Sequence, residues 1–281
     1  MYLISYGTRP ELIKLFPLIN IFKENNIDHK TIFTGQHEDL IKEFENLTHR
    51  PDFVLEKTMK HKQSINSLIY KIINESQKII NSYDCKVIIQ GDAASSFAVA
   101  LSAFNEGKEV IHVEAGLRTH NLRSPFPEEG FRKMISHISN IHFCPTIKSV
   151  ENLKNEGITE NVHLVGNTIV DSCAQIIDKG ESSDYLNELI SSNDDYYLCT
   201  LHRRENINNF QSMWEQLNQI SENKTIIYIK HPSVPNSEDF LGKNIIKLDP
   251  MTYQDMVFAI NNSKGLISDS GGLQEEAICL N

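Results

Sequence analysis

The segment VIIQGDAASSFAVALSAFNEGKEVIHVE, residues 87–114, decides the fold class of this chain. Its two apolar runs, Val87–Gln90 and Val110–Val113, flank a stretch that starts a helix at Ala93. Both runs lack the apolar–polar alternation of a half-exposed strand, so they favour parallel strands covered on both faces. The segment therefore predicts a strand–helix–strand unit of a doubly wound α/β sheet.

The same alternation extends in both directions from this segment. Amphipathic stretches such as Ser64–Ile80 favour helices between the strands, and Pro17 is expected to interrupt and kink the helix after the first strand. Eight further apolar runs predict strands: Tyr2–Ser5, Thr31–Phe33, Ile141–Phe143, His163–Val165, Tyr196–Cys199, Ile226–Ile229, Ile245–Leu248 and Gly265–Ile267.

Two Rossmann-like domains are predicted, residues 1–170 and residues 171–281, with a ligand site in the cleft between them. The polar stretch Asp178–Asp195 precedes a new strand and favours a boundary near it. The second half holds four expected strands, fewer than a doubly wound domain normally has. We expect this half to be incomplete, with exposed strand edges and apolar faces.

The composition excludes several classes of protein. Lys and Arg number 27 and Asp and Glu 37, a formal net charge of −10, and no basic stripe for nucleic acid is seen. No apolar run approaches the roughly 18 residues of a membrane span, and no signal peptide is recognisable. Five widely spaced cysteines without a CxxC pair favour free thiols in the cytoplasm.

The sequence Gly7-Thr8-Arg9-Pro10-Glu11 follows the first strand directly. Glycine permits a tight turn, and proline suits the first position of a helix. A helix N-terminus beside Arg9 is suited to a diphosphate, and Lys14 follows about one turn later. The alternative is a helix start that carries surface charges.

Carboxylates follow the two strands of the deciding segment and open the next helix. Asp92 and Glu114 come after strands, and Glu128 and Glu129 stand at a predicted helix start. Ligands in open α/β sheets bind beyond such strand ends, and converging carboxylates suit proton removal and return. Alternatively, Asp92 caps a helix and Glu128 or Glu129 interacts with the helix dipole.

Two motifs of the second half also follow strands. The segment Thr200–Asn206 has two interpretations. In the first, Arg203 or Arg204 contacts a phosphate and His202 balances charge. In the second, the segment is a solvated loop. In SDSGGLQEEA, residues 268–277, a serine–glycine turn opens a helix whose free N–H groups suit a diphosphate. Glu276 is placed to accept hydrogen bonds from ribose hydroxyls, against the alternative of an ordinary helix start.

Nine motifs occur in the order seen in the non-hydrolysing UDP-N-acetylglucosamine 2-epimerases, which this chain resembles from residue 1 to residue 281. The resemblance implies a GT-B fold, a homodimer and no metal or nicotinamide cofactor. The motifs are GTRPE (7–11), TGQH (34–37), QGD (90–92), HVEAGLRT (112–119), PFPEE (125–129), FCPT (143–146), VGNTIVD (165–171), LHRREN (201–206) and SDSGGLQEEA (268–277).

The resemblance implies reversible inversion at C2 of UDP-N-acetylglucosamine, giving UDP-N-acetylmannosamine for polysaccharide synthesis. UDP is eliminated to a 2-acetamidoglucal and then added back. By motif, Asp92, Glu114 and Glu128 are acid–base candidates, with no face of C2 assigned to any of them, and His202 meets the leaving diphosphate. The implied substrate-binding set is Arg9, Lys14, Arg132, Ser270, Gly271, Gly272 and Glu276.

The sequence departs from the family pattern at two places. Phe131 stands where the pattern has asparagine, and we expect this to alter the support of Glu128. Relatives continue beyond SDSGGLQEEA, so a nearly complete site on an unstable second half is expected. A GT-B glycosyltransferase and a remnant that at most binds UDP are the competing hypotheses. The carboxylate set disfavours glycosyl transfer, which does not require removal of the C2 proton.

Overall fold

The computed structural model divides the chain into two compact units, Met1–Thr168 and Ile169–Asn281. The structure describes residues 1–35, 38–55, 63–193, 195–201, 206, 210–231, 234 and 242–280.

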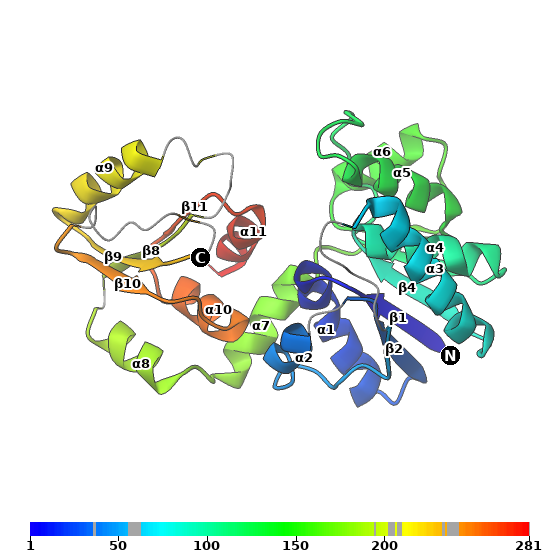
Figure 1. Cartoon of the computed structure of the whole chain (residues 1–281), viewed down its shortest axis with the longest axis horizontal. Coiled ribbons are helices and arrows are strands. Elements are labelled where there is room, and N and C mark those ends of the chain that lie inside the picture. Colours follow the sequence, from blue (N-terminus) through cyan, green and yellow to red (C-terminus); the bar gives the residue numbers. More distant parts are fainter. Residues whose placement is uncertain are drawn as a thin grey trace. The chain divides into compact units, whose positions relative to one another are not determined.

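A parallel sheet forms the centre of the first unit (Figure 1). Its order, β3-β2-β1-β4-β5-β6-β7, reverses direction between β1 and β4 and so creates the switch point at which doubly wound folds bind ligands. The strands are β1 (Tyr2–Tyr6), β2 (His29–Phe33), β3 (Phe53–Val54), β4 (Lys86–Gln90), β5 (Val110–Val113), β6 (Ile141–Cys144) and β7 (Val162–Leu164).

Helices connect these strands and cover the sheet. A core joins Leu3, Val87 and Ile89 of the sheet to α3, α4 and α5, where Ile72 and Ile135 are among the buried side chains. The helices are α1 (Arg9–Glu24), α2 (Glu38–Glu43), α3 (Ile65–Asn81), α4 (Ala94–Asn105), α5 (Glu128–Ile138) and α6 (Ile147–Asn155). The doubly wound α/β prediction is confirmed for this unit.

Pro17 does not interrupt α1, so that expectation was wrong. The helix runs from Arg9 to Glu24 with Pro17 buried inside it. Proline removes one backbone hydrogen bond from a helix interior. On α1 the side chains of Leu15, Phe16 and Ile19 are at most 1% exposed, and their burial offsets that loss.

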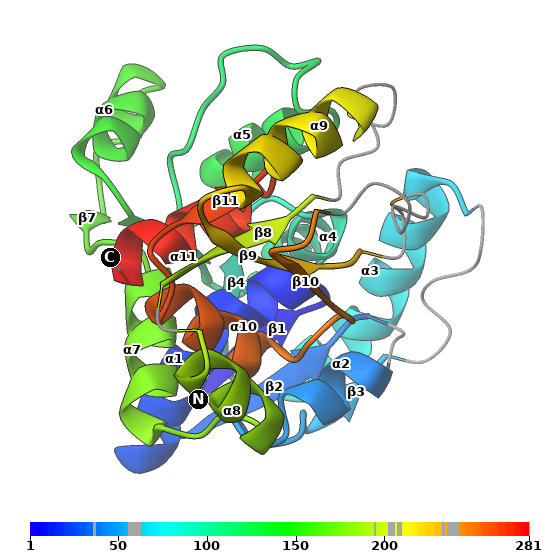
Figure 2. The same ribbon diagram turned by 90° about the vertical axis from the view of Figure 1, so that its left-hand side faces the viewer.

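The second unit contains a parallel sheet in the order β10-β9-β8-β11. In both views α9 and α10 lie on opposite faces of this sheet (Figures 1 and 2). Trp214 of α9 packs with Tyr228, whereas Ile260 of α10 packs with Ile227. The elements are α7 (Ile169–Lys179), α8 (Asp184–Ser191), β8 (Tyr196–Thr200), α9 (Phe210–Ser221), β9 (Thr225–Ile229), β10 (Ile245–Leu248), α10 (Tyr253–Asn261), β11 (Leu266–Ser268) and α11 (Gly271–Leu280).

All ten predicted strands are present, with their ends shifted by at most two residues. A further strand, β3, was not predicted, because an edge strand of two residues is too short to show periodicity. The polar stretch Asp178–Asp195 lies within the second unit and contains α8. Leu186 anchors that helix, because its side chain is buried in the core of the unit.

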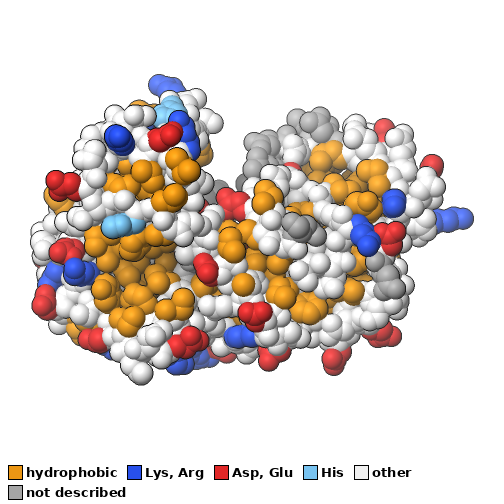
Figure 3. Space-filling view, turned by 180° about the vertical axis from the view of Figure 1, so that it is seen from behind, with side chains coloured by type: hydrophobic (Ala, Val, Ile, Leu, Met, Phe, Trp, Pro, Cys, Tyr) orange, Lys and Arg blue, Asp and Glu red, His pale blue; other side chains and the backbone are white. Residues whose placement is uncertain are grey.

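Apolar side chains also reach the surface, as the face drawn in Figure 3 illustrates. Tyr70, Phe126, Ile147 and Ile278 are each more than 65% exposed. Exposed apolar side chains are common in folded proteins, and by themselves they assign no function. Over the described part of the chain, no helix is both long and apolar enough to cross a membrane.

Candidate active site

The polar residues of the first unit gather at the carboxyl ends of β1, β4 and β5. Helix α1, which follows β1, begins at Arg9, the end of β4 leads to Asp92, and Glu114 follows β5. β1 pairs with β4, and β4 pairs with β5 with Gln90 opposite Val113. The sheet order therefore brings Asp92 and Glu114 to neighbouring strand ends at the switch point.

Glu114 is held by two donors on neighbouring elements. Lys14 of α1 forms an ion pair with Oε1, and the Gln90 side-chain amide donates to Oε2. The side chains of Glu114 and Lys14 are 11% and 13% exposed. The backbone of Glu114 has φ +67°, a left-handed conformation that non-glycine residues rarely adopt and that is common at functional sites. The structure thus places Lys14 against the Glu114 carboxylate.

Asp92 is paired with Arg132 of α5. Arg132 Nε lies 2.8 Å from Asp92 Oδ2, and its Nη2 contacts the same oxygen. The N-cap of α4 is Ala93, which makes no capping hydrogen bond through its side chain. The helix-cap alternative for Asp92 is therefore wrong, since an arginine of another helix holds its carboxylate.

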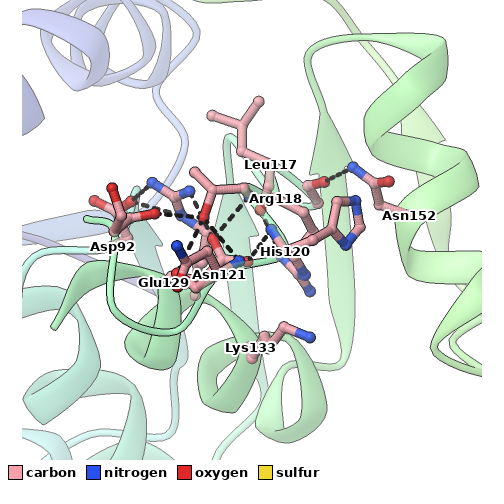
Figure 4. A network of polar contacts seen from close by, with 12 residues as sticks. Asp92, Leu117, Arg118, His120, Asn121, Glu129, Lys133 and Asn152 are labelled. Atoms are coloured by element: carbon pink, nitrogen blue, oxygen red, sulfur yellow. Dashed lines mark hydrogen bonds and ion pairs between the residues drawn. The ribbon is translucent and has the colours of Figure 1, made fainter. Parts of the chain in front are cut away.

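The consecutive residues Glu128 and Glu129 have different environments. Glu129 accepts hydrogen bonds from the Thr119 and His120 backbone N–H groups, each at 3.0 Å, and pairs with Arg132 (Figure 4). Burial raises the pKa of Glu129, but these hydrogen bonds and the Arg132 charge outweigh burial and hold it below its usual value. Within the described residues, no hydrogen bond or ion pair engages the half-buried Glu128 carboxylate.

His112 supports this site without carrying a charge. Its side chain is completely buried on β5, and Nε2 donates to the Gly91 carbonyl at 2.8 Å. Burial lowers the pKa of His112 to about 3, so the imidazole is neutral near pH 7. Gly91 itself has φ +69°, which glycine adopts without strain, and it immediately precedes Asp92.

Glu11 is an important residue that the sequence analysis passed over. Its buried carboxylate accepts from the Gly7 and Thr8 N–H groups at 2.9 and 2.6 Å, and from the hydroxyls of Ser95 and Ser96. Glu11 thereby joins the loop after β1 to the start of α4. The Thr8-x-x-Glu11 spacing of a capping box was the signal that could have identified it.

Arg9 lies apart from the carboxylate pairs described above. Its Nη2 is 2.6 Å from Glu43 Oε1 of α2, and the side chain is 45% exposed. In the described part of the structure Arg9 therefore contacts Glu43, and not Asp92 or Glu114. Its assignment to a phosphate stays a prediction.

Phe131, the departure from the family pattern, packs in the core between α4 and α5. Its ring stacks on that of Phe97 with centroids 4.9 Å apart and planes at 12°. Both residues belong to the core of the first unit, and Phe131 is 7% exposed. At this position the chain therefore has an apolar contact between two helices.

Replacing Phe131 with leucine is expected to lower the free energy of unfolding by about 1–2 kcal/mol. The change removes the aromatic pair with Phe97 and leaves part of the ring volume unfilled. Urea denaturation of the wild type, F131L, F97L and the double variant measures this loss. A double variant whose loss equals the sum of the single losses would contradict a direct contact.

In the second unit, Ser270 lies between β11 and α11, and Gly271 and Gly272 are the first two residues of α11. The Ser270 N–H donates to Ser268 Oγ at 3.0 Å, and Ser270 Oγ accepts from the Leu273 N–H at 3.4 Å. A Cβ built on Gly272 meets no atom within 4 Å. Packing within the described structure therefore does not require glycine at this position.

Glu276 lies one turn further along α11, and its side chain is buried. Burial and then the nearby Glu276 charge raise the pKa of the Cys173 thiol to about 12. All five cysteines are free thiols. His202, with Arg203 and Arg204, lies outside the described residues, so its predicted role is not placed by the structure.

Comparisons with known proteins agree with the motifs. Residues 20–281 match the UDP-N-acetylglucosamine 2-epimerase family. The UDP-N-acetylglucosamine 2-epimerase of Campylobacter jejuni is 35% identical, over 98% of this chain and 78% of the relative. The Neisseria meningitidis enzyme is 34% identical over 98% of this chain and 79% of its own length.

Solved structures give the same result. The crystal structure of the Neisseria meningitidis UDP-GlcNAc 2-epimerase bound to UDP-GlcNAc matches with a TM-score of 0.84 and 31% identity, covering 98% of this chain and 79% of that chain. The Methanocaldococcus jannaschii enzyme in complex with UDP-GlcNAc and UDP matches at 0.81 and 34%, covering 100% and 82%. The GT-B prediction is confirmed by these neighbours, and the chain belongs to the UDP-N-acetylglucosamine 2-epimerase family.

Proposed function

We propose that this protein catalyses the reversible epimerisation of UDP-N-acetylglucosamine at C2, giving UDP-N-acetylmannosamine. Family membership supports this function, and relatives have been solved with UDP-GlcNAc bound. The observation that carries the proposal is the pair of carboxylates at neighbouring strand ends, each with its own cation. Glu114 has Lys14, and Asp92 has Arg132.

The chemistry requires such a pair because C2 must lose a weakly acidic proton and regain one on its other face. A base takes the C2 proton, the C1–O bond to UDP breaks, and a C1–C2 double bond forms. UDP oxygen then attacks C1 while an acid delivers a proton to C2. Asp92, Glu114 and Glu128 are the proposed proton carriers. Lys14 and Arg132 keep two of these carboxylates oriented.

The UDP contacts are proposed from the motifs. Helix α11 begins directly after Ser270, so Gly271 and Gly272 present N–H groups at a helix N-terminus, which favours an anion. Glu276 is proposed to accept hydrogen bonds from the ribose. Arg9 and His202 are proposed to meet the diphosphate. Arg132 acts on the substrate through Asp92 in this proposal, because its guanidinium lies against that carboxylate.

The family match favours epimerisation over the competing glycosyltransferase hypothesis. The Anabaena protein HepE in complex with UDP and glucose has the same fold class, with a TM-score of 0.57, but only 13% identity. That likeness concerns the fold alone. The Asp92 and Glu114 pairs serve a C2 proton transfer, which simple glycosyl transfer does not include.

Proton NMR of UDP-N-acetylglucosamine with the protein in deuterated water tests the proposal. We expect the manno epimer to appear with deuterium at C2, because the returning proton comes from solvent-exchanged carboxyl groups. Free N-acetylmannosamine with UDP would indicate a hydrolysing enzyme. Folded protein that binds UDP by titration calorimetry but neither exchanges nor turns over the substrate would contradict the proposal.

We also propose that the protein is a cytoplasmic homodimer that supplies polysaccharide synthesis. Five free thiols support a reducing compartment. The homodimer is the assembly that the resemblance to the UDP-N-acetylglucosamine 2-epimerases implies, and Tyr70 of α3, 70% exposed, is the position chosen to test it. Light scattering after size exclusion of the wild type and Y70D tests the dimer, and a wild-type monomer would exclude it.

A further inference from the structure

The Glu129 carboxylate is fully buried although it belongs to the first turn of α5. Its Oε1 accepts the His120 N–H, and its Oε2 accepts the Thr119 N–H and Arg132 Nη1, the last at 2.9 Å. A buried charge is stable when donors of this kind surround it. Because the side chain has no exposed surface, Glu129 does not reach a substrate.

On one side, this contact continues through Arg132 to Asp92. The guanidinium is a rigid planar fork: Nη1 lies against Glu129, while Nε and Nη2 lie against Asp92 Oδ2. Two carboxylates therefore fix the plane of one cation. Without Glu129, only the contacts with Asp92 would orient the guanidinium, and both side chains would gain freedom.

On the other side, Glu129 holds the loop that joins β5 to α5. Figure 4 shows Glu129 beside this loop, whose Thr119 and His120 N–H groups donate to its carboxylate. His120 has φ +60°, and the Thr119 hydroxyl closes the loop by donating to the Ser124 carbonyl at 2.7 Å. The same loop begins at Glu114 and leads to Glu128. One buried carboxylate thus joins the arginine that holds Asp92 to the loop that runs from Glu114 to Glu128.

We propose that Glu129 is a positioning residue for the epimerisation, which fixes Arg132 against Asp92 and fixes the Thr119–His120 turn without touching the reacting atoms. The inference rests on the proposed function and deepens it. It also separates the two consecutive glutamates: Glu128 remains available for proton transfer, and Glu129 serves the geometry.

The first variant is Glu129→Gln. A glutamine amide offers one acceptor oxygen, and its NH2 group would face N–H donors, so Arg132 and the turn lose their common partner. A displacement of about 1 Å costs about 10²-fold in rate. We expect kcat to fall by about 10²-fold while KM changes by less than about threefold.

Two NMR measurements report the positioning without any activity. In the wild type we expect the Arg132 Nε–H and the Thr119 and His120 amides to be protected from solvent exchange, because each donates to a carboxylate oxygen. We expect E129Q to lose this protection by about tenfold or more. The matched control is Glu75→Gln, which breaks another i,i+3 pair, Glu75–Lys78 at 2.8 Å, on the exposed surface of α3. It should change neither kcat nor the three signals.

Two more variants complete the test. Glu129→Asp keeps the charge, but its side chain is shorter by one methylene. This variant should fold even if E129Q does not. We expect its kcat to be about tenfold lower than that of the wild type. Glu156→Gln breaks a buried ion pair with Arg118 and leaves Arg132 and Asp92 untouched. It should keep kcat within about threefold of the wild type.

The proposal is overturned if a folded E129Q or E129D keeps wild-type kcat, or if the three exchange signals do not change. It is also overturned if E156Q loses as much kcat as E129Q, since the effect would then be general loosening of the loop. A wild type that does not epimerise UDP-N-acetylglucosamine would defeat the proposed function instead. The exchange measurements would still decide whether Glu129 positions Arg132.

Discussion

Replacing Glu114 with glutamine is expected to lower kcat for UDP-N-acetylglucosamine by about 10³-fold. A positioned general acid or base contributes about 10²- to 10⁴-fold. Both oxygens of the Glu114 carboxylate are held, one by Lys14 and one by Gln90. A glutamine amide keeps the shape but takes up no proton from C2. Turnover is measured by proton NMR of both epimers.

A control for this variant lies at the other end of β5. Glu109 immediately precedes β5, whereas Glu114 follows it, and Glu109 pairs with Lys86 at 2.6 Å with both side chains nearly half exposed. Such exposed pairs contribute about 0–1 kcal/mol to stability. Glu109→Gln should therefore keep wild-type kcat. A folded Glu114→Gln variant within about threefold of wild-type kcat would remove Glu114 from the proton carriers.

Replacing Glu156 with leucine is expected to lower the free energy of unfolding by about 3 kcal/mol. The Arg118 side chain is completely buried, and it donates through Nε and Nη2 to Glu156, with Nη2 at 2.7 Å from Oε2. Removing one partner of a buried pair leaves an uncompensated charge, which costs about 3–5 kcal/mol. The low end applies because Ser136 and the Leu117 carbonyl still accept from Arg118.

Replacing Arg118, the other partner of the pair, is the control for this prediction. In Arg118→Met no buried cation remains, and Glu156 keeps its ion pair with Lys133 at 3.1 Å. We expect a smaller loss than for Glu156→Leu, and a double variant less destabilised than Glu156→Leu alone. Urea denaturation of the four proteins measures the cycle. Equal losses in both single variants would contradict the argument from an uncompensated charge.

The same pair predicts how stability depends on pH. Hydrogen bonds from Arg118 lower the pKa of Glu156 to about 2, so its stabilisation is full above the ordinary value of 4.5 and is lost as pH falls toward 2. Burial lowers the pKa of His142 from its ordinary value of 6.5 to about 4. The folded state therefore resists protonation of this imidazole, and stability is lost as the pH falls below 6.5. Stability should fall from pH 6.5 downward. In Glu156→Gln, the decrease below pH 4.5 should be smaller.

The sequence predicted the fold because its signals are local. Buried parallel strands such as Val110–Val113 are continuous apolar runs, and the motifs stand directly after them. The capping box at Thr8 and Glu11 was equally local, although it was not used. By contrast, β3 pairs through only two residues, and α1 continues through Pro17 because of what packs against it.

The partners of the charged residues could not be predicted in this way. From the sequence, Asp92 was equally suited to cap α4 or to line a site, and Glu128 and Glu129 were indistinguishable at a helix start. The tertiary structure gives Asp92 an arginine from α5 and buries Glu129 beneath a loop. Phe131, which departs from the family pattern, has its stacking partner on α4.

The sequence by itself determined the order of strands and helices, the positions of the motifs at strand ends and the family to which the chain belongs. Only the tertiary structure decided which charges meet: Lys14 with Glu114 across 100 residues, Asp92 with Arg132 across 40, and Arg118 with Glu156 across 38. The physical reason is that strand order in the sheet brings distant segments together. Where these segments are buried, a charged group is stable only when it has a hydrogen-bonding or oppositely charged partner.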